Sequence, residues 1–132
     1  MIALMTDFGV QDTYVGVMKG VMSRIDPTVS FIDITHAIQP QNVRQAALAL
    51  QNAYRYFPRG TVFLIVVDPG VGSARKPIAV EAGGYYFFAP DNGVLSYTLA
   101  EIKARTGKPA HAVALTNPAY QMDFVSQTFH GR

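Results

Sequence analysis

The sequence has no cysteine among its 132 residues, and charged residues make up only 15% of it. The absence of cysteine excludes disulfide frameworks, zinc sites built from thiolates and thiol nucleophiles, and it is consistent with a reducing cytoplasm. The formal net charge is +2, and the lysines and arginines are too scattered to form the dense basic stripe of a nucleic-acid-binding surface. We therefore expect a cytoplasmic protein that does not bind nucleic acid.

Long hydrophobic runs and the commonest enzyme motifs are also missing. The apolar residues 1–5 are followed at once by Thr6-Asp7, so they are too short for a signal-peptide core or a membrane span. The sequence Gly70-Val71-Gly72 lacks the third glycine of a dinucleotide fingerprint, and no Walker lysine, Gly-x-Ser-x-Gly or His-Glu-x-x-His motif occurs. The histidines, at positions 36, 111 and 130, have no metal-ligand spacing. We expect no membrane, metal or cofactor.

Hydrophobic residues, at 49% of the chain, are sufficient for one folded domain, and no repeat or linker is evident. Apolar residues at helical spacing predict helices over about 14–25, 43–57 and 94–105. Short β-branched or aromatic runs predict strands at 2–5, 29–35, 61–67, 77–82, 85–89 and 111–116, and the 61–67 strand is apolar enough to be covered on both faces. Gly83-Gly84 predicts a hairpin. The expected fold is an α/β, three-layer α/β/α sandwich with a mixed, mainly parallel central sheet.

Three aspartates, Asp7, Asp33 and Asp68, lie at or near the carboxyl ends of predicted parallel strands. Ligands bind beyond this edge of open α/β sheets, so the grouping indicates a binding site there. Each aspartate taken alone is equally typical of a turn or a helix cap. The position of the strands therefore suggests a site without identifying its chemistry.

An ordered set of motifs identifies the chain as similar to a known family. The motifs are Thr6-Asp7-Phe8-Gly9 followed by Asp12, Met18-Lys19-Gly20, Asp68-Pro69-Gly70-Val71-Gly72, Arg75, Pro90-Asp91-Asn92-Gly93, and Thr128-Phe129-His130-Gly131-Arg132. In this order they resemble the S-adenosyl-L-methionine hydroxide adenosyltransferases, which are related to the fluorinases and chlorinases. The resemblance runs from residue 2 to residue 132.

The resemblance implies that water cleaves S-adenosyl-L-methionine at its ribose 5′ carbon, giving adenosine and L-methionine without a cofactor. Asp68, Arg75 and His130 match the family's water-activating set, and the halogenating relatives have an aromatic residue at the position of Asp68. Asp7 is implied to hold the ribose hydroxyls and Asp12 to lie near the methionine end. The other implied substrate-binding residues are Phe8, Gly70, Val71, Asn92 and Gly131, although the 91–93 segment also reads simply as a tight turn.

The residue types suit this chemistry. The sulfonium of the substrate leaves as a neutral thioether, so no general acid is needed, and a carboxylate or imidazole can instead take the proton of an attacking water. Asp68 and His130 are both candidates for this base, and the sequence does not decide between them. The guanidinium of Arg75 can hold the carboxylate and stabilise developing hydroxide character.

The resemblance also implies parts that residues 1–132 do not contain. Family members continue into a smaller β-rich carboxyl-terminal domain, and the adenine site lies between this domain and the amino-terminal domain of a neighbouring subunit in a trimer. We therefore expect residues 1–132 to form a truncated amino-terminal domain of a homo-oligomer. Two alternative functions remain open. One is halide-dependent adenosyl transfer, and the other is that of a non-catalytic module for nucleoside binding or assembly.

Overall fold

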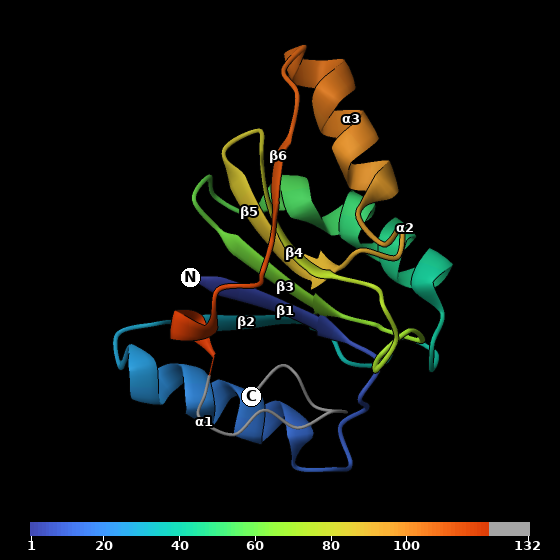
Figure 1. The fold of residues 1–132 in the computed structure, drawn as a ribbon. Coiled ribbons are helices and arrows are strands. Elements are labelled where there is room, and N and C mark those ends of the chain that lie inside the picture. The colour runs from blue at the N-terminus through green and yellow to red at the C-terminus, as the bar shows by residue number, and fades with distance from the viewer. Residues whose placement is uncertain (122–132) are drawn as a thin grey trace.

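Residues 1–121, the part of the chain that the computed structural model describes, form six strands and three α-helices (Figure 1). In chain order the elements are β1 (Ile2–Thr6), α1 (Tyr14–Ile25), β2 (Phe31–Thr35), α2 (Val43–Ala53), a 3₁₀ turn η1 (Tyr54–Tyr56), β3 (Val62–Val66), β4 (Pro77–Ala82), β5 (Tyr85–Pro90), α3 (Ser96–Thr106), β6 (His111–Ala114) and a second 3₁₀ turn η2 (Pro118–Tyr120). Every predicted helix and strand is present, with ends shifted by a few residues.

The strands form one mixed sheet in the order β2-β1-β3-β5-β4-β6. Pairing is parallel from β2 to β5, and β4 runs antiparallel to both β5 and β6. The chain moves outward from β1 to β2 and then back past β1 to β3, so right-handed crossovers put α1 and α2 on opposite faces. Figure 1 shows α1 on one side of the sheet and α2 with α3 on the other. The predicted three-layer, mainly parallel α/β fold is confirmed.

The hydrophobic core lies between the sheet and the pair α2 and α3. Alternate strand residues such as Met5, Phe63 and Phe87 point into it and meet Leu50 of α2. Phe63 and Phe87 stack with their ring centroids 5.2 Å apart. The alternation follows from the two-residue period of a strand, which sends every second side chain to the same face.

The opposite face of the sheet is less covered than the sequence predicts. The residues of β3 alternate between fully and partly buried, and Tyr86 in the neighbouring strand β5 is 44% exposed. The prediction that residues 61–67 are covered on both faces is therefore wrong for the described part of the chain. The physical reason is that α1 is the one α-helix of residues 1–121 on this face, whereas α2 and α3 both cover the other.

The hairpin between β4 and β5 turns at Gly83-Gly84, where both residues have positive φ angles of 60° and 83°. These angles suit glycine and confirm the predicted two-residue turn. At Gly83 a Cβ atom would lie 2.8 Å from Cγ2 of the buried Ile102. The hairpin therefore needs glycine here for its backbone and for the space under α3.

Replacing Gly83 with alanine is expected to destabilise the protein by left-handed backbone strain of about 1–2 kcal/mol and by a further 1–3 kcal/mol or so from overpacking against Ile102. Gly107→Ala is the matched control, because Gly107 has φ 68° and an added Cβ would meet nothing within 4 Å. Urea denaturation monitored by circular dichroism measures both variants. Equal losses at the two positions would contradict the packing role assigned to Gly83.

Candidate active site

The carboxyl ends of the parallel strands bring four polar residues to one edge of the sheet. Asp7 follows β1, His36 follows β2, Asp68 lies shortly after β3, and Asn92 lies shortly after β5. Strands β1 and β3 are direct neighbours that pair as far as their last residues, and the Asp7 N–H donates to the carbonyl of the last β3 residue, Val66, at 3.4 Å. The site predicted from strand order is therefore one continuous edge.

Asp68 and Arg75 are brought together by the turn that follows β3. The carbonyl of Asp68 accepts from the Val71 N–H at 3.2 Å, and the Gly70 carbonyl accepts from the Ser73 N–H at 3.0 Å. These bonds reverse the chain so that the Arg75 guanidinium forms an ion pair with Asp68 Oδ2. Only 9% of the Asp68 side chain and 13% of the Arg75 side chain are exposed. The pair is thus largely removed from solvent.

Two atoms of this buried pair have no hydrogen-bond partner among the described residues. They are Asp68 Oδ1, an acceptor, and Arg75 Nε, a donor. A buried polar atom without a partner is costly, so such atoms usually bind a water or a ligand group. The pair therefore offers both a proton acceptor and a cationic donor to a small polar molecule.

Gly70 provides room for this arrangement. A Cβ at this position would lie 3.1 Å from Arg75 Cγ and 3.6 Å from Asp68 Oδ1. A side chain would therefore crowd Arg75 and Ser73, whose Oγ would lie 3.2 Å from the Cβ, whereas the distance to Asp68 is an ordinary contact. The neighbouring Val71 is 39% exposed, at the surface of the same turn.

Asn92 supports the edge of the sheet from the β5 side. Its Nδ2 donates to the Val67 carbonyl at 2.9 Å, and its Oδ1 accepts from the Val94 N–H at 3.2 Å. The side chain therefore joins the end of β5 to the residue preceding Asp68. This geometry fits the turn interpretation of residues 91–93.

The Asp7 carboxylate is held by a backbone N–H of the loop between β2 and α2, at a residue with an unusual backbone conformation. Its Oδ2 accepts from the Gln41 N–H at 2.8 Å, and Gln41 is the one non-glycine residue with positive φ, at 64°, within residues 1–121. Such a conformation is uncommon and costs free energy in a residue that bears a side chain, and strained residues of this kind cluster at functional sites. The neighbouring Phe8 packs edge-on against Tyr14, with ring centroids 6.0 Å apart.

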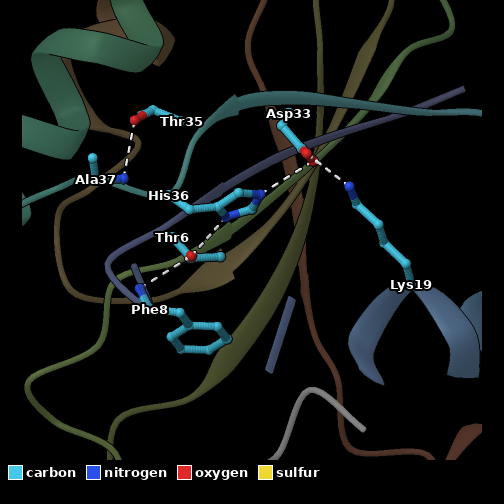
Figure 2. A network of polar contacts seen from close by, with 7 residues as sticks. All are labelled: Thr6, Phe8, Lys19, Asp33, Thr35, His36 and Ala37. Atoms are coloured by element: carbon cyan, nitrogen blue, oxygen red, sulfur yellow. Dashed lines mark hydrogen bonds and ion pairs between the residues drawn. The ribbon is translucent and has the colours of Figure 1, made fainter. Parts of the chain in front are cut away.

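A polar network joins the end of β1 to the end of β2 (Figure 2). Thr6 and His36 are buried in it, whereas Asp33 and Lys19 are partly exposed. His36 Nδ1 is 2.8 Å from the Thr6 hydroxyl, and His36 Nε2 is 3.1 Å from Asp33 Oδ1, a charge contact whose angle is not that of an aligned hydrogen bond. Asp33 Oδ2 in turn accepts from Lys19 Nζ at 2.7 Å. Partial burial opposes ionisation of Asp33, but the hydrogen bond from Lys19 and the contact with His36 together outweigh it and lower the pKa of Asp33.

The spacing of His36 from the other histidines did not predict this network. The useful signal was its position. Asp33 and His36 flank the end of β2, and Thr6 ends the neighbouring parallel strand β1. Aligning the carboxyl ends of two predicted parallel strands would have brought the three residues together.

The remaining predicted residues are less constrained. Asp12 is exposed in the loop before α1. His130 and Gly131 lie outside the described residues, so the structure joins Asp68 to Arg75 and does not place the third member of the predicted set. Within residues 1–121 no three carboxylate or imidazole side chains are arranged to hold a metal ion. In the same part of the chain, no helix is long and apolar enough to cross a membrane.

Comparison with known proteins assigns the chain that forms this edge to a family. The family described as SAM hydroxide adenosyltransferase, N-terminal domain, matches residues 2–132. The chain belongs to this family. It is 44% identical over 131 residues to a Salinispora tropica protein named (R)-S-adenosyl-L-methionine hydrolase, a match that covers 99% of this chain and 48% of that protein. An Actinopolyspora mzabensis fluorinase is more distant, at 31% identity over 76% of this chain and 42% of that protein.

The fold of this SAM hydroxide adenosyltransferase domain also matches a solved structure. A crystal structure of an uncharacterized conserved protein from Thermotoga maritima superimposes with a TM-score of 0.92 at 43% sequence identity. That match covers all of this chain and 50% of the other. The chain thus spans about half the length of the curated relatives it matches.

Proposed function

We propose that the protein containing this domain hydrolyses S-adenosyl-L-methionine to adenosine and L-methionine. The observation that carries the proposal is the buried Asp68–Arg75 pair, whose Oδ1 and Nε have no partner among the described residues. This pair lies at the sheet edge that also bears Asp7. The names of relatives at 37–44% identity support the same reaction, and the fluorinase match is weaker.

In the proposed mechanism, a water molecule binds against Asp68 and Arg75 and attacks the ribose 5′ carbon as the carbon–sulfur bond breaks. Arg75 uses Oδ2 of the carboxylate, which leaves Oδ1 to accept a hydrogen bond from the water. The proton passes to Asp68 or to His130, and the sulfur leaves with the bonding electrons as neutral L-methionine. Low solvent access favours the reaction, because charge disperses in the transition state.

The substrate-binding assignments belong to the same proposal. Asp7 accepts hydrogen bonds from the ribose hydroxyls, and Asp12 lies near the methionine end. Phe8, Gly70, Val71, Asn92 and Gly131 complete the substrate contacts. S-Adenosyl-L-methionine is the substrate, and the reaction uses no cofactor.

We further propose that residues 1–132 act as the amino-terminal domain of a cytoplasmic homotrimer, in which a β-rich carboxyl-terminal domain of a neighbouring subunit completes the adenine pocket. The match to a family described as an N-terminal domain, together with coverage of about half of each relative, supports the part of this proposal that concerns a second domain. Analytical ultracentrifugation of the full-length gene product is expected to give the mass of a trimer. A monomer that retains full activity would contradict it.

The reaction is tested by incubating the full-length gene product with S-adenosyl-L-methionine and separating the products by chromatography with mass detection. Equimolar adenosine and L-methionine are the expected products. Formation of 5′-halo-5′-deoxyadenosine when chloride or fluoride is added would favour the halogenase alternative instead. Calorimetry that shows adenosine binding, together with no turnover, would favour the non-catalytic module.

A further inference from the structure

His36 holds the main chain on both sides of Asp7. Before Asp7, its Nδ1 meets the Thr6 hydroxyl at 2.8 Å; after Asp7, its carbonyl accepts from the Gly9 N–H at 2.8 Å. The Thr6 hydroxyl oxygen also accepts from the Phe8 N–H at 3.2 Å. His36, which follows β2, thereby helps to fix the position of the loop after β1 that bears the Asp7 carboxylate.

The order of carboxylate, imidazole and hydroxyl resembles that of a hydrolytic triad, but its burial excludes that use. Thr6 has no exposed surface and His36 is 6% exposed, so a substrate carbon cannot reach the hydroxyl. A nucleophile must contact the reacting atom. The group therefore acts on the loop and not on the substrate directly.

The contacts assign a direction to each proton. Asp33 is an acceptor when ionised, and its negative charge beside His36 favours the tautomer with hydrogen on Nε2. Nδ1 of this tautomer is an acceptor, so the Thr6 hydroxyl donates to it, and the hydroxyl oxygen remains free to accept from the Phe8 N–H. In the other tautomer, the Thr6 oxygen would accept from both Nδ1–H and the Phe8 N–H, the Thr6 O–H would have no acceptor among the described residues, and the lone pair of Nε2 would face the Asp33 carboxylate.

Lys19 links this chain of contacts to α1. Its Nζ neutralises Asp33, which is partly exposed at the outer end of the network (Figure 2). The contacts thus run from α1 through β2 to the end of β1. They connect three elements that the sequence separates by up to 30 positions.

We propose that Asp33, His36 and Thr6 are positioning residues that fix the loop of Asp7 for nucleoside binding. The inference rests on the proposed function, which supplies the role of Asp7. Removing the Thr6 hydroxyl frees the Phe8 N–H and one side of the loop, so affinity for adenosine falls while Asp68 and Arg75 stay in place. A change confined to binding separates this role from a general loss of fold.

The first test is independent of activity. Long-range ¹⁵N–¹H NMR of the full-length gene product, with His36 signals assigned by comparison with a His36→Asn variant, reports the ring tautomer. Hydrogen on Nε2 is the expected result, and hydrogen on Nδ1 overturns the inference. In Thr6→Val, the Phe8 amide is expected to exchange with solvent about tenfold faster than in the wild type; unchanged exchange also overturns it.

The second test measures adenosine binding by calorimetry. Thr6→Val is expected to raise Kd about tenfold, and Thr6→Ser, which restores the hydroxyl, to stay within about threefold of the wild type. Thr98→Val is the matched control, because Thr98 is fully buried and its hydroxyl has no partner within residues 1–121. Wild-type affinity in Thr6→Val overturns the inference. Failure of the wild type to form adenosine from S-adenosyl-L-methionine contradicts the proposed function instead, and the tautomer and exchange measurements still decide the positioning role.

Discussion

Replacing Asp68 with asparagine is expected to lower kcat for adenosine formation by roughly 10²–10⁴-fold, the contribution typical of a positioned general base. The substitution keeps the shape of the side chain but removes the charge that pairs with Arg75 and, with it, the proposed acceptor of the proton of water. Adenosine affinity should change by less than about threefold, because in the proposed mechanism Asp68 contacts the attacking water and not the nucleoside. Initial rates with S-adenosyl-L-methionine and calorimetry with adenosine measure the two effects separately.

Asp91→Asn is the control for this substitution. Asp91 lies near the same edge of the sheet, is exposed, and uses its main-chain N–H to bond to the Lys76 carbonyl at 2.8 Å. The kcat of the Asp91→Asn variant should remain within about twofold of the wild type, since surface substitutions of this kind usually change stability little. If Asp68→Asn also stays within twofold while His130→Ala loses turnover, His130 is the base and Asp68 is not.

Asp7→Ala is expected to weaken adenosine binding by roughly 10²-fold. A hydrogen bond to a charged group contributes about 1.5–3 kcal/mol, and a tenfold change in Kd corresponds to about 1.4 kcal/mol. Oδ2 of Asp7 already accepts from the Gln41 N–H, so the carboxylate is oriented before any ligand arrives. Calorimetry at fixed salt concentration measures the loss.

A double-mutant cycle with 2′-deoxyadenosine separates a ribose contact from a change of fold. In the wild type, loss of the 2′ hydroxyl should weaken binding about tenfold or more, whereas Asp7→Ala should bind adenosine and 2′-deoxyadenosine almost equally. Interaction between the two changes measures the contact itself. Additive losses would show that Asp7 does not meet the 2′ hydroxyl.

Much of the fold was predictable because local patterns agreed with the tertiary structure. Gly107, with φ 68°, caps α3 where the sequence ends it, and Asn42 caps α2 by accepting from the Gln45 N–H. Thr13 stands at the N-cap position of α1, directly before the predicted helix, and makes no side-chain capping bond. The helical pattern through residue 57 was extended too far, because after Ala53 the chain tightens into the 3₁₀ turn η1.

The candidate site was predictable only in part. The motif containing Asp68 and Arg75 predicted that both residues act together, and the turn after β3 pairs them. No pattern along the chain predicted that Gln41 would donate to Asp7, because that bond spans 34 positions and depends on a left-handed backbone at Gln41. The two residues meet only when β1 and β2 lie side by side.

The sequence by itself determined the elements, the mixed sheet and the family, because hydrophobic period, turn glycines and ordered motifs are properties of neighbouring residues. The tertiary structure decided which polar groups are buried together. It paired Asp68 with Arg75 away from solvent, and it joined His36 to Thr6, the residue before Asp7. Burial and hydrogen-bond direction depend on contacts between distant segments, and these contacts exist only once the parallel strands pair.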